Sequence, residues 1–495
     1  MSNLARFSLV VLKKVEQAEK EECYHMKKLL IAVCMILSLT LATGLAEMES
    51  FGFDFPDDGD TQADWNMATA IVQNIERPKI PTDYSVNVVK EYGAVGDGAA
   101  DDKPAIQKAI DETSEKGGGQ VVVPAGTYFC KGSIELKSYV DLHLEEGATL
   151  LFSPVAADFL PVVKTRWEGT ELLNYSPMVY AYGQHDIAIT GKGKIDGNQD
   201  SEFLAMMKNE GSRADVATLR QMGADGVPLE ERVFGEGHYL RPSCIQINYC
   251  DRVLLEDYTV TNSPFWINHV NCSNHVQVRG LTVDSMFGNN DGVDIESSTF
   301  VVVEENNFHT GDDSVVVKAG RDYDGRQVGL PSKYIVVRNN IMGGEDGIAL
   351  GSEMAGGISY VFFENNTLPE GVSVIRFKSN LDRGGTVEHI RVRNMDIGNF
   401  KNFIWFQMKY PGDQGGNFPA IYNDIVFEDF TVDSISETLF KCEAPAGYPL
   451  QNVLIKDVTV MESATTTLQM ENLKNLVLDD FVVNDQRMNG VISSY

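Results

Sequence analysis

The sequence predicts an all-β protein, a single-domain right-handed parallel β-helix of stacked coils with an N-terminal capping helix. Three observations predict this fold. A degenerate repeat of short apolar strands runs from residue 253 to residue 483. Each copy breaks at a polar pair before an apolar residue resumes the pattern. A segment with helical apolar spacing precedes the repeats, and stacked coils need such a cap over their open end.

The repeat has nine copies, which start 23 to 35 residues apart. Each copy alternates apolar and polar residues with period two, which is typical of a strand with one buried face. One copy cannot bury its own apolar face, so we expect the copies to stack as parallel strands around a continuous apolar column. The copies begin at Val253, Val276, Val301, Ile335, Val361, Ile390, Ile425, Val453 and Leu476.

Asparagine pairs mark the bend in several copies. They are Asn306-Asn307, Asn339-Asn340 and Asn365-Asn366, and stacking of the copies predicts that their side chains form ladders. A leucine-rich repeat fits less well, because its leucine spacing and its shorter, regular period are absent. A β-sandwich also fits less well, because its hairpin turns would not recur in phase.

The chain before the repeats divides into segments of different character. Residues 97–112 have an Asp at the expected N-cap, Pro104 in the first turn and apolar residues at helical spacing, which predicts the capping helix. Residues 47–85 are acidic and weakly patterned, so we expect a linker there and the β-helix domain over 86–495. Residues 199–232 carry much charge and no repeat, which predicts a long insertion.

Residues 1–46 are expected to be an upstream extension followed by a signal peptide. Two lysines follow Met26, and the apolar run LLIAVCMILSLTLA ends in small residues up to Ala46. These are the three parts of a secretory signal, so we expect export to the periplasm or the outside. The apolar run is short for a membrane span and no second run follows, so no stable membrane insertion is expected after cleavage.

Charge and cysteine content narrow the class of partner. The chain has 71 acidic and 41 basic residues, a formal net charge of −30, which argues against nucleic acid and anionic membranes. The net charge does not exclude a polyanionic substrate, provided that cationic residues gather at the site. Five scattered cysteines remain after the leader, and their spacing predicts neither a disulfide framework nor a metal site. Cys250 and Cys272 precede neighbouring copies, and the sequence does not decide whether they are buried thiols or form a disulfide.

Three aspartates are expected to converge on adjoining coils. Asp291 lies in one copy, and Asp312 and Asp313 lie in the next, in the stretch HTGDDSVVVK. Stacked coils are about 4.8 Å apart, so matching positions become neighbours. Two copies further on, Arg376 and Lys378 have i, i+2 spacing, which sends both side chains to one face of a strand.

This combination of residues suits hydrolysis of an acidic sugar polymer. Anionic neighbours raise the pKa of one carboxyl, which then stays protonated and donates to the leaving oxygen. The other carboxylates deprotonate an attacking water. The paired cations suit a substrate carboxylate, and this chemistry requires no metal and no cofactor.

Five motifs resemble glycoside hydrolase family 28, which contains the polygalacturonases and related pectin hydrolases. The motifs occur in the family's order and are NSPFW at Asn262, NNDG at Asn289, TGDD at Thr310, DGIALGSEMAGG at Asp346 and RFK at Arg376. The stretches EYGAVGDG at Glu91 and LRP at Leu240 resemble bacterial members. The resemblance covers about residues 86–485.

The resemblance implies inverting hydrolysis of α-1,4-linked galacturonate in pectic polysaccharides. It assigns the general acid to Asp312 and the activation of water to Asp291 and Asp313. It assigns the grip on a substrate carboxylate to Arg376 and Lys378. Two further residues are expected to bind substrate: Tyr410 in FQMKYPG, by the resemblance, and Lys318 in KAGRD, as an extension of the cationic site.

One departure from the family pattern affects the expected substrate. The family's Gly-His-Gly appears here as Glu345-Asp346-Gly347, so Asp346 stands where a His is expected. Asp346 and Asp312 both lie 11 residues into their copies, which predicts that Asp346 sits beside the acid. There it would raise the pKa of the acid or bind a substrate hydroxyl, and rhamnogalacturonan or a substituted pectin becomes an alternative substrate.

Two other classes of function stay open at this point. A β-helix lyase also acts on acidic sugars and commonly uses Ca²⁺, which aspartates can bind. A non-catalytic carbohydrate-binding β-helix would not need the carboxylates. The choice between endo and exo cleavage depends on whether loops close one end of the cleft. The 199–232 insertion is a candidate wall, and its resemblance to insertions in bacterial relatives favours exo action.

Overall fold

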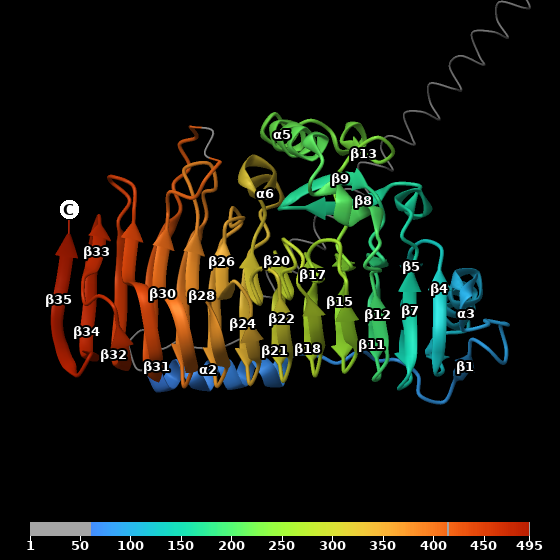
Figure 1. The fold of residues 1–495 in the computed structure, drawn as a ribbon, viewed down its shortest axis with the longest axis horizontal. Coiled ribbons are helices and arrows are strands. Elements are labelled where there is room, and N and C mark those ends of the chain that lie inside the picture. Colours follow the sequence, from blue (N-terminus) through green and yellow to red (C-terminus); the bar gives the residue numbers. More distant parts are fainter. Residues whose placement is uncertain (1–60, 413–414, 495) are drawn as a thin grey trace, which may run out of the picture. The chain divides into compact units, whose positions relative to one another are not determined.

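A computed structural model describes residues 61–412 and 415–494, and the expected leader lies outside these residues. From Asp64 onward the chain forms one compact unit, a row of stacked coils of mostly parallel strands (Figure 1). The predicted parallel β-helix is therefore confirmed. Within the described residues, no helix has the length and apolar character needed to cross a bilayer.

Each full coil contributes one strand to each of three faces, and the repeat face carries the nine predicted copies. Its strands are β1 (Ser85–Asn87), β3 (Gly119–Val123), β6 (Val140–Leu144), β11 (His185–Thr190), β15 (Asp251–Glu256), β18 (Asn274–Arg279), β21 (Thr299–Glu304), β24 (Ser332–Arg338), β27 (Ile358–Glu364), β29 (Thr386–Arg393), the start of β31 (Ile421–Glu443), β32 (Leu450–Ser463) and β34 (Leu473–Val483).

The back face follows the repeat face along the chain. Its strands are β2 (Asp97–Asp101), β4 (Gly126–Cys130), β7 (Ala148–Phe152), β12 (Lys194–Asp196), β16 (Thr259–Thr261), β19 (Thr282–Ser285), β22 (Asn307–Thr310), β25 (Ile341–Gly343) and the first parts of β28 (Thr367–Lys378) and β30 (Asp396–Gln407). The middle of β31 continues this face.

The site face completes each coil. Its strands are β5 (Ile134–Glu135), β10 (Val179–Tyr182), β14 (Ile245–Asn248), β17 (Asn268–Asn271), β20 (Val293–Glu296), β23 (Val315–Lys318), β26 (Asp346–Gly351), the ends of β28, β30 and β31, and β33 (Leu468–Glu471). At the C-terminal end, β35 (Gln486–Ser494) pairs antiparallel with β34.

The register of the repeat face is the one that the sequence predicts. Val253 pairs with Val276, Val276 pairs with Val301, and the column continues through every predicted start to Leu476. These nine side chains are at most 1% exposed. Because full burial of one such side chain contributes about 1.5–3 kcal/mol, a slip of one residue along a strand would be costly.

A predicted asparagine ladder runs beside this column. Asn306 Nδ2 donates to Asn340 Oδ1 at 2.8 Å, and Asn340 Nδ2 donates to Asn366 Oδ1 at 2.9 Å. The preceding Asn339 and Asn365 have φ of 57° and 56°, a left-handed conformation that asparagine tolerates better than most residues. The ladder therefore satisfies buried polar groups at the bend between the repeat face and the back face.

Charged side chains alternate in sign along the outer side of the repeat face. The column is Glu256, Arg279, Glu304, Arg338, Glu364, Arg393, Glu428, Lys456 and Asp479. Two of its ion pairs, Arg338–Glu304 and Arg393–Glu364, measure 2.7 and 2.8 Å. Ion pairs that still face solvent contribute about 0–1 kcal/mol each. Their alternation acts against mispairing, because a shift by one coil would bring like charges together.

The capping helix begins as predicted, with Asp102 at its N-cap and Pro104 in its first turn. Helix α3 spans Lys103–Glu115, and the residues from Asp97 to Asp101 form β2 before it. The Asp102 carboxylate accepts from the backbone N–H groups of Val95 and Gly96, which fixes the turn before the helix. Ile106 and Ile110 are fully buried against the first coils, so the capping role is confirmed.

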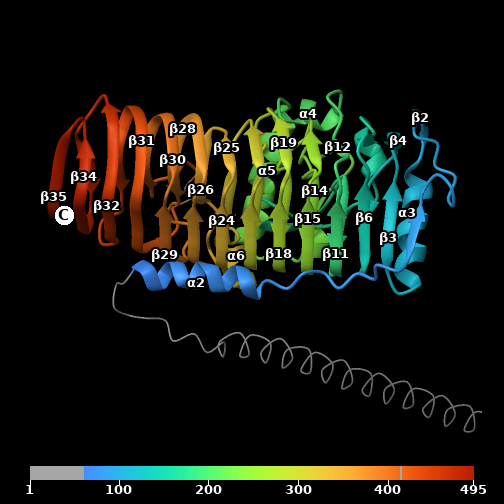
Figure 2. The same ribbon diagram turned by 90° about the horizontal axis from the view of Figure 1, so that it is seen from below.

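Part of the expected linker is a helix. Helix α2 spans Thr61–Asn74 and runs along the repeat face (Figure 2). Its Trp65 and Ile71 belong to an apolar cluster with Val336 and Phe362 of that face. Trp65 Nε1 also donates to a Glu428 oxygen at 2.6 Å. A linker was the wrong expectation for these residues, because their few apolar side chains cover an apolar patch on the outside of the coils.

The predicted insertion is helical and lies over the middle of the coil row (Figure 1). It contains α4 (Glu202–Met206), α5 (Glu210–Ala224) and the 3₁₀ turn η2 (Leu229–Glu231). A small sheet of β8 (Val163–Trp167), β9 (Thr170–Asn174) and β13 (Val233–Phe234) lies beside it, with α6 (Asp322–Val328) on the other side (Figure 1). A further 3₁₀ turn, η1, spans Ala156–Phe159.

The cysteines do not form the pair that the sequence left open. Cys130, Cys244, Cys250, Cys272 and Cys442 are all free thiols. The Cys250 N–H donates to Ser273 Oγ at 3.0 Å, so Cys250 stacks on the residue after Cys272.

Replacing Asn340 with alanine should lower the free energy of unfolding by about 1–3 kcal/mol, because it leaves buried donors and acceptors of the ladder without partners. Urea denaturation followed by circular dichroism measures the change. Asn399→Ala is the matched control, since Asn399 is exposed and only accepts from Ser434 Oγ. Equal losses in the two variants would contradict a structural role for the buried ladder.

Candidate active site

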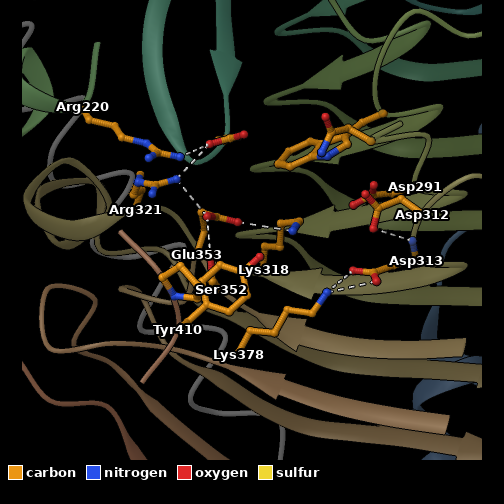
Figure 3. A pocket seen from close by; sticks show the side chains of 14 residues that line it. Arg220, Asp291, Asp312, Asp313, Lys318, Arg321, Ser352, Glu353, Lys378 and Tyr410 are labelled. Carbon is orange, nitrogen blue, oxygen red and sulfur yellow. Dashed lines mark hydrogen bonds and ion pairs between the residues drawn. The ribbon is translucent and has the colours of Figure 1, made fainter. Parts of the chain in front are cut away.

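The site face carries a pocket with a volume of about 120 Å³. Six of the eight predicted site residues line it: Asp291, Asp312, Asp313, Lys318, Lys378 and Tyr410. The other lining residues are Glu168, Arg220, Trp266, Asn289, Arg321, Ser352, Glu353 and Pro411 (Figure 3). Arg376 and Asp346 do not line the pocket.

Asp291 and Asp313 occupy the same position on neighbouring coils. Each lies two residues before a site-face strand, β20 or β23, and these strands pair in register. The Gly292 N–H donates to the Asp313 carbonyl oxygen at 3.0 Å. Asp312 precedes Asp313 in the same turn, and the Asp313 N–H donates to Asp312 Oδ1 at 3.0 Å. Two coils therefore bring the three carboxyl groups to one pocket, as the sequence predicts.

The next coil departs from the prediction by one residue. Asp346 stacks on Asp313, and the Ser314 N–H donates to the Asp346 carbonyl oxygen at 2.9 Å. The Glu345 N–H donates to the Asp312 carbonyl oxygen at 3.0 Å, so Glu345 is the residue beside Asp312. The predicted neighbourhood of Asp346 is wrong because this coil has one residue fewer before its site-face strand.

Burial gives two of the carboxyls unusual proton affinity. Asp291 and Asp313 are 3% and 2% exposed. Burial raises the pKa of Asp313 to about 8, although the Lys378 ammonium acts in the opposite direction. Burial also raises the pKa of Asp291 well above its usual range, and the charges of Asp294 and Asp312 add to the effect. The cluster therefore holds protons at a pH where isolated carboxyls have lost them.

Lys378 joins the pocket to a buried ion-pair group. Its Nζ donates to the Asp313 oxygens at 2.7 and 3.0 Å and lies 3.0 Å from Asp346 Oδ2. Asp346 is fully buried. Burial opposes its ionisation, but Lys378 and Arg376 outweigh that effect and hold the pKa of Asp346 below its usual value. The structure thus makes Asp346 a counter-ion of the two cations and not a pocket residue.

Arg376 lies at the edge of the site and is held from several sides. Its Nη1 is 3.2 Å from Asp346, and its Nε and Nη2 donate to Gln407 Oε1 at 3.1 and 2.6 Å. The guanidinium also lies 4.5 Å from the Trp405 ring centroid and 6.0 Å from that of Tyr410. Its side chain is 15% exposed, so little of it is available to a ligand in this arrangement.

Lys318 lines the pocket but is already paired. Its Nζ lies 3.3 Å from Glu353 Oε2 and donates to the Gly351 carbonyl oxygen at 3.2 Å. It also stands 4.7 Å from the Trp266 ring centroid, where a cation–π contact is favourable. Sequence analysis found Lys318 but not Glu353, although Glu353 lies within the DGIALGSEMAGG motif.

A charged wall lines one side of the pocket, and sequence analysis missed most of it. Arg220 on α5 donates to Glu168 Oε2 at 2.9 Å, and Arg321 donates to the same oxygen at 3.0 Å. Arg321 also donates to Glu353 at 3.0 Å (Figure 3). The charge of the 199–232 insertion was the only sequence signal for Arg220. Nothing in the sequence indicated Glu168, because the β8–β9 hairpin folds back over distant coils.

Arg241, in the LRP stretch, holds the turn that carries Asp291. Its Nη1 donates to the carbonyl oxygens of Pro264 and Gly288 at 2.6 and 3.1 Å, and its Nη2 donates to Asn289 Oδ1 at 2.8 Å. Arg241 is 5% exposed. Its role is therefore to position the pocket lining.

Clustered carboxyl groups beside cations on one face of a parallel β-helix suit an enzyme that acts on an acidic sugar polymer. Residues 231–481 match the model of the glycosyl hydrolases family 28, and the chain belongs to this family. It is therefore a glycoside hydrolase. Residues 85–144 match a second model, described as rhamnogalacturonase A/epimerase, pectate lyase-like.

Relatives with known names cover most of the chain. A "Probable polygalacturonase" from Vitis vinifera is 30% identical over 76% of this chain and 74% of its own. An "Exo-poly-alpha-D-galacturonosidase" from Dickeya chrysanthemi is 27% identical over 88% of this chain and 71% of its own. The crystal structure of an exopolygalacturonase from Thermotoga maritima superposes with a TM-score of 0.80 at 35% identity, covering 87% of this chain and 99% of its own. The fold is the right-handed β-helix of that family.

Replacing Lys378 with methionine should move the acidic limb of the pH profile of kcat/KM to higher pH. Lys378 lowers the pKa of Asp313, so without the cation Asp313 stays protonated to higher pH and cannot accept a proton. A shift of one unit corresponds to about 1.4 kcal/mol. Lys441→Met is the control, because Lys441 lies further along the same face and pairs with Glu443. An unchanged acidic limb in Lys378→Met would contradict the coupling.

Proposed function

We propose that the protein hydrolyses α-1,4-galacturonosidic linkages in pectin, with inversion and from the chain end. The observation that carries this proposal is the pocket that joins three aspartates from two coils to four cationic side chains. The polygalacturonase and exopolygalacturonase names of the relatives support the same substrate class.

In the proposed mechanism, Asp312 donates a proton to the glycosidic oxygen as the bond to the anomeric carbon breaks. Asp291 and Asp313 accept a proton from a water that attacks the opposite face of the sugar. A C–O bond to water replaces the C–O bond to the leaving group, so the configuration inverts. The raised pKa of Asp291 and of Asp313 suits the acceptor role, because a stronger base takes the proton of water more readily.

The substrate carboxylate is proposed to bind the N–H groups of the pocket cations. Arg220, Lys318, Arg321 and Lys378 line the pocket, and each already contacts a carboxylate. A galacturonate carboxylate would therefore accept hydrogen bonds from the N–H groups that these ion pairs leave unused. Tyr410 lines the same pocket and suits contact with a sugar ring, whereas Arg376 stands outside it and is held by Asp346 and Gln407.

Exo action is supported by the charged wall on one side of the pocket. The β8–β9 hairpin, helix α5 and the segment before α6 meet there through Glu168, Arg220 and Arg321. An apolar cluster beneath them, which includes Trp167, Leu219 and Phe265, anchors the wall to the coils. We propose that this wall stops a polymer from running on in that direction, so only a chain terminus would fit.

Rhamnogalacturonan is a second candidate substrate. The match of residues 85–144 to a rhamnogalacturonase-type model favours it, as does the absence of the family His at Asp346. The description of the same family model includes the term pectate lyase-like. A β-elimination reaction, which gives an unsaturated product, is therefore a further alternative.

The proposed activity is tested with oligomers of defined ends made from homogalacturonan and from rhamnogalacturonan. We expect release of single galacturonate units from homogalacturonan oligomers, with new reducing ends and no near-ultraviolet absorbance. Oligomers cut internally would contradict exo action. Cleavage restricted to rhamnogalacturonan would favour the second substrate, and near-ultraviolet absorbance would identify a lyase.

The control for this test is a pair of Asp→Asn variants on neighbouring coils. Asp312→Asn should lower kcat by about 10²–10⁴-fold, the usual contribution of a general acid. Asp284→Asn should leave kcat unchanged, because Asp284 is exposed outside the pocket and pairs with His309. Full activity in Asp312→Asn would refute the assigned acid.

We also propose that the protein is exported, because residues 26–46 have the composition of a secretory signal and the proposed substrate is a wall polymer outside the cell. The mature N-terminus of the secreted protein, read by mass spectrometry, should lie near residue 47. Retention of Met26 in protein recovered from the cell interior would contradict export.

A further inference from the structure

Glu353 is a buried carboxyl that lines the pocket, and the proposed mechanism gives it no role. It follows β26 in the DGIALGSEMAGG motif and is 4% exposed. Its carbonyl oxygen accepts from the Ala319 N–H at 2.7 Å, which fixes its backbone to the end of β23. The side chain of Glu353 therefore starts from a defined place next to Lys318.

Three cationic side chains from different segments surround the Glu353 carboxylate. Its Oε1 lies 3.0 Å from Arg321 Nη1 and 3.9 Å from Arg383 Nη2, and it accepts from Ser352 Oγ at 2.8 Å. Its Oε2 lies 3.3 Å from Lys318 Nζ (Figure 3). Burial opposes ionisation, but the cations outweigh that effect and hold the pKa of Glu353 below its usual value. Glu353 is therefore an ionised carboxylate.

The two lysines of the pocket are held in opposite ways. Lys378 Nζ lies 2.7 Å from Asp313 Oδ2, so this lysine compensates one of the carboxyls proposed to activate water. Lys318 Nζ lies 3.3 Å from Glu353 Oε2 instead. Among the described residues, the next carboxyl that pairs with Lys318 is Asp294, at 3.8 Å, which is beyond hydrogen-bond distance.

Asp294 lies on β20, three residues after Asp291, and both side chains are buried. Both carboxyl oxygens of Asp294, and Oδ1 of Asp291, lack a hydrogen bond within the described residues. A buried carboxyl without donors gains much from a nearby cation, so these aspartates would bind an ammonium group that reached them. Glu353 thus competes with them for Lys318.

Arg321, the second cation on Glu353, keeps donors to spare. Its Nη1 donates to Glu353 and to Glu168 at 3.0 Å each, which uses both N–H groups of that nitrogen. Its Nε makes no hydrogen bond within the part of the chain that the structure describes. A guanidinium has five N–H donors, so donors remain for a further carboxylate while Glu353 holds Arg321 in place.

We propose that Glu353 is a positioning residue that keeps Lys318 away from Asp291 and Asp294 and holds it, with Arg321, for the carboxylate of the substrate. It acts through these two cations, and no bond or proton of Glu353 changes in the reaction. The inference rests on the proposed function, in which the pocket cations bind a galacturonate carboxylate and Asp291 accepts a proton from water. One lysine cannot compensate Asp291 and bind the substrate at once, and Glu353 decides between the two.

The charged groups around Glu353 and Asp291 determine the sign of a pH effect. Those that face Glu353 are Lys318, Arg321, Arg383, Glu296 and Tyr410. Those that face Asp291 are Asp294, Asp312, Asp313, Lys318 and Arg241. An uncharged residue in place of Glu353 removes one negative charge and lets Lys318 approach Asp294. Both changes weaken proton binding by the coupled carboxyls, so the acidic limb of the kcat/KM profile moves to lower pH.

Glu353→Gln tests this role, because the amide has nearly the shape of the carboxylate but no charge. We expect KM for galacturonate oligomers to rise roughly 10–100-fold, the range for loss of one hydrogen bond to a charged group, and the acidic limb to move to lower pH. Thermal unfolding checks that the variant folds. Glu304→Gln is the matched control and should behave as the wild type, since Glu304 is 8% exposed and pairs with Arg338 on the repeat face.

Lys318→Met shows whether Glu353 acts through Lys318. If it does, Glu353→Gln should change KM and the acidic limb much less in the Lys318→Met background than in the wild type. Lys318→Met alone should also raise KM, which keeps the proposal testable if Glu353→Gln does not fold. Equal effects of Glu353→Gln in the two backgrounds, or an unchanged KM in Lys318→Met, would overturn the proposal.

A crystal structure of Glu353→Gln gives a readout that does not depend on activity. It should show Lys318 Nζ within hydrogen-bond distance of Asp294, and a Lys318 that stays away from Asp294 would overturn the proposal. A wild type that is inactive on every pectic oligomer would instead refute the proposed function. The crystal structure would then still decide which carboxyl holds Lys318.

Discussion

The register between stacked coils is the constraint on which the rest of the structure depends. Main-chain bonds, the buried column from Val253 to Leu476 and the asparagine ladder all fix the same pairing. The site has no independent scaffold of its own. Asp291 and Asp313 meet only because β20 and β23 pair in register, and a slip of one residue would turn Asp313 away from the pocket.

Charge in the pocket is nearly balanced, despite the net charge of −30 for the chain. Four cations and five carboxyl groups line it, and one bound proton makes the set neutral. Each of these cations contacts a carboxylate, so under the proposed function the pocket would recognise an acidic sugar through the direction of its N–H groups more than through excess positive charge. Because the pocket has no excess of cations, burial raises the pKa of Asp291 and of Asp313 despite the nearby lysines.

The sequence predicted the fold and six of the fourteen residues that line the pocket, because the spacing of the repeat copies shows which residues stack on neighbouring coils. Counting from repeat starts misplaced Asp346, because Val315 follows Val301 by 14 residues whereas Ile348 follows Ile335 by 13. Such a one-residue change in a turn leaves no mark on the apolar pattern. Glu168 and Arg220 escaped prediction for another reason: their hairpin and helix lie outside the repeat, and only tertiary folding brings them to the site.

The central claim is that carboxyl groups from two coils act on opposite faces of one sugar. Proton NMR of the first product released from an α-linked galacturonate oligomer tests it most directly. The account predicts that the β-anomer appears first and then equilibrates with the α-anomer, since a single displacement by water inverts the anomeric centre. An α-anomer as the initial product would contradict the account, because it would require a covalent intermediate on one of the aspartates.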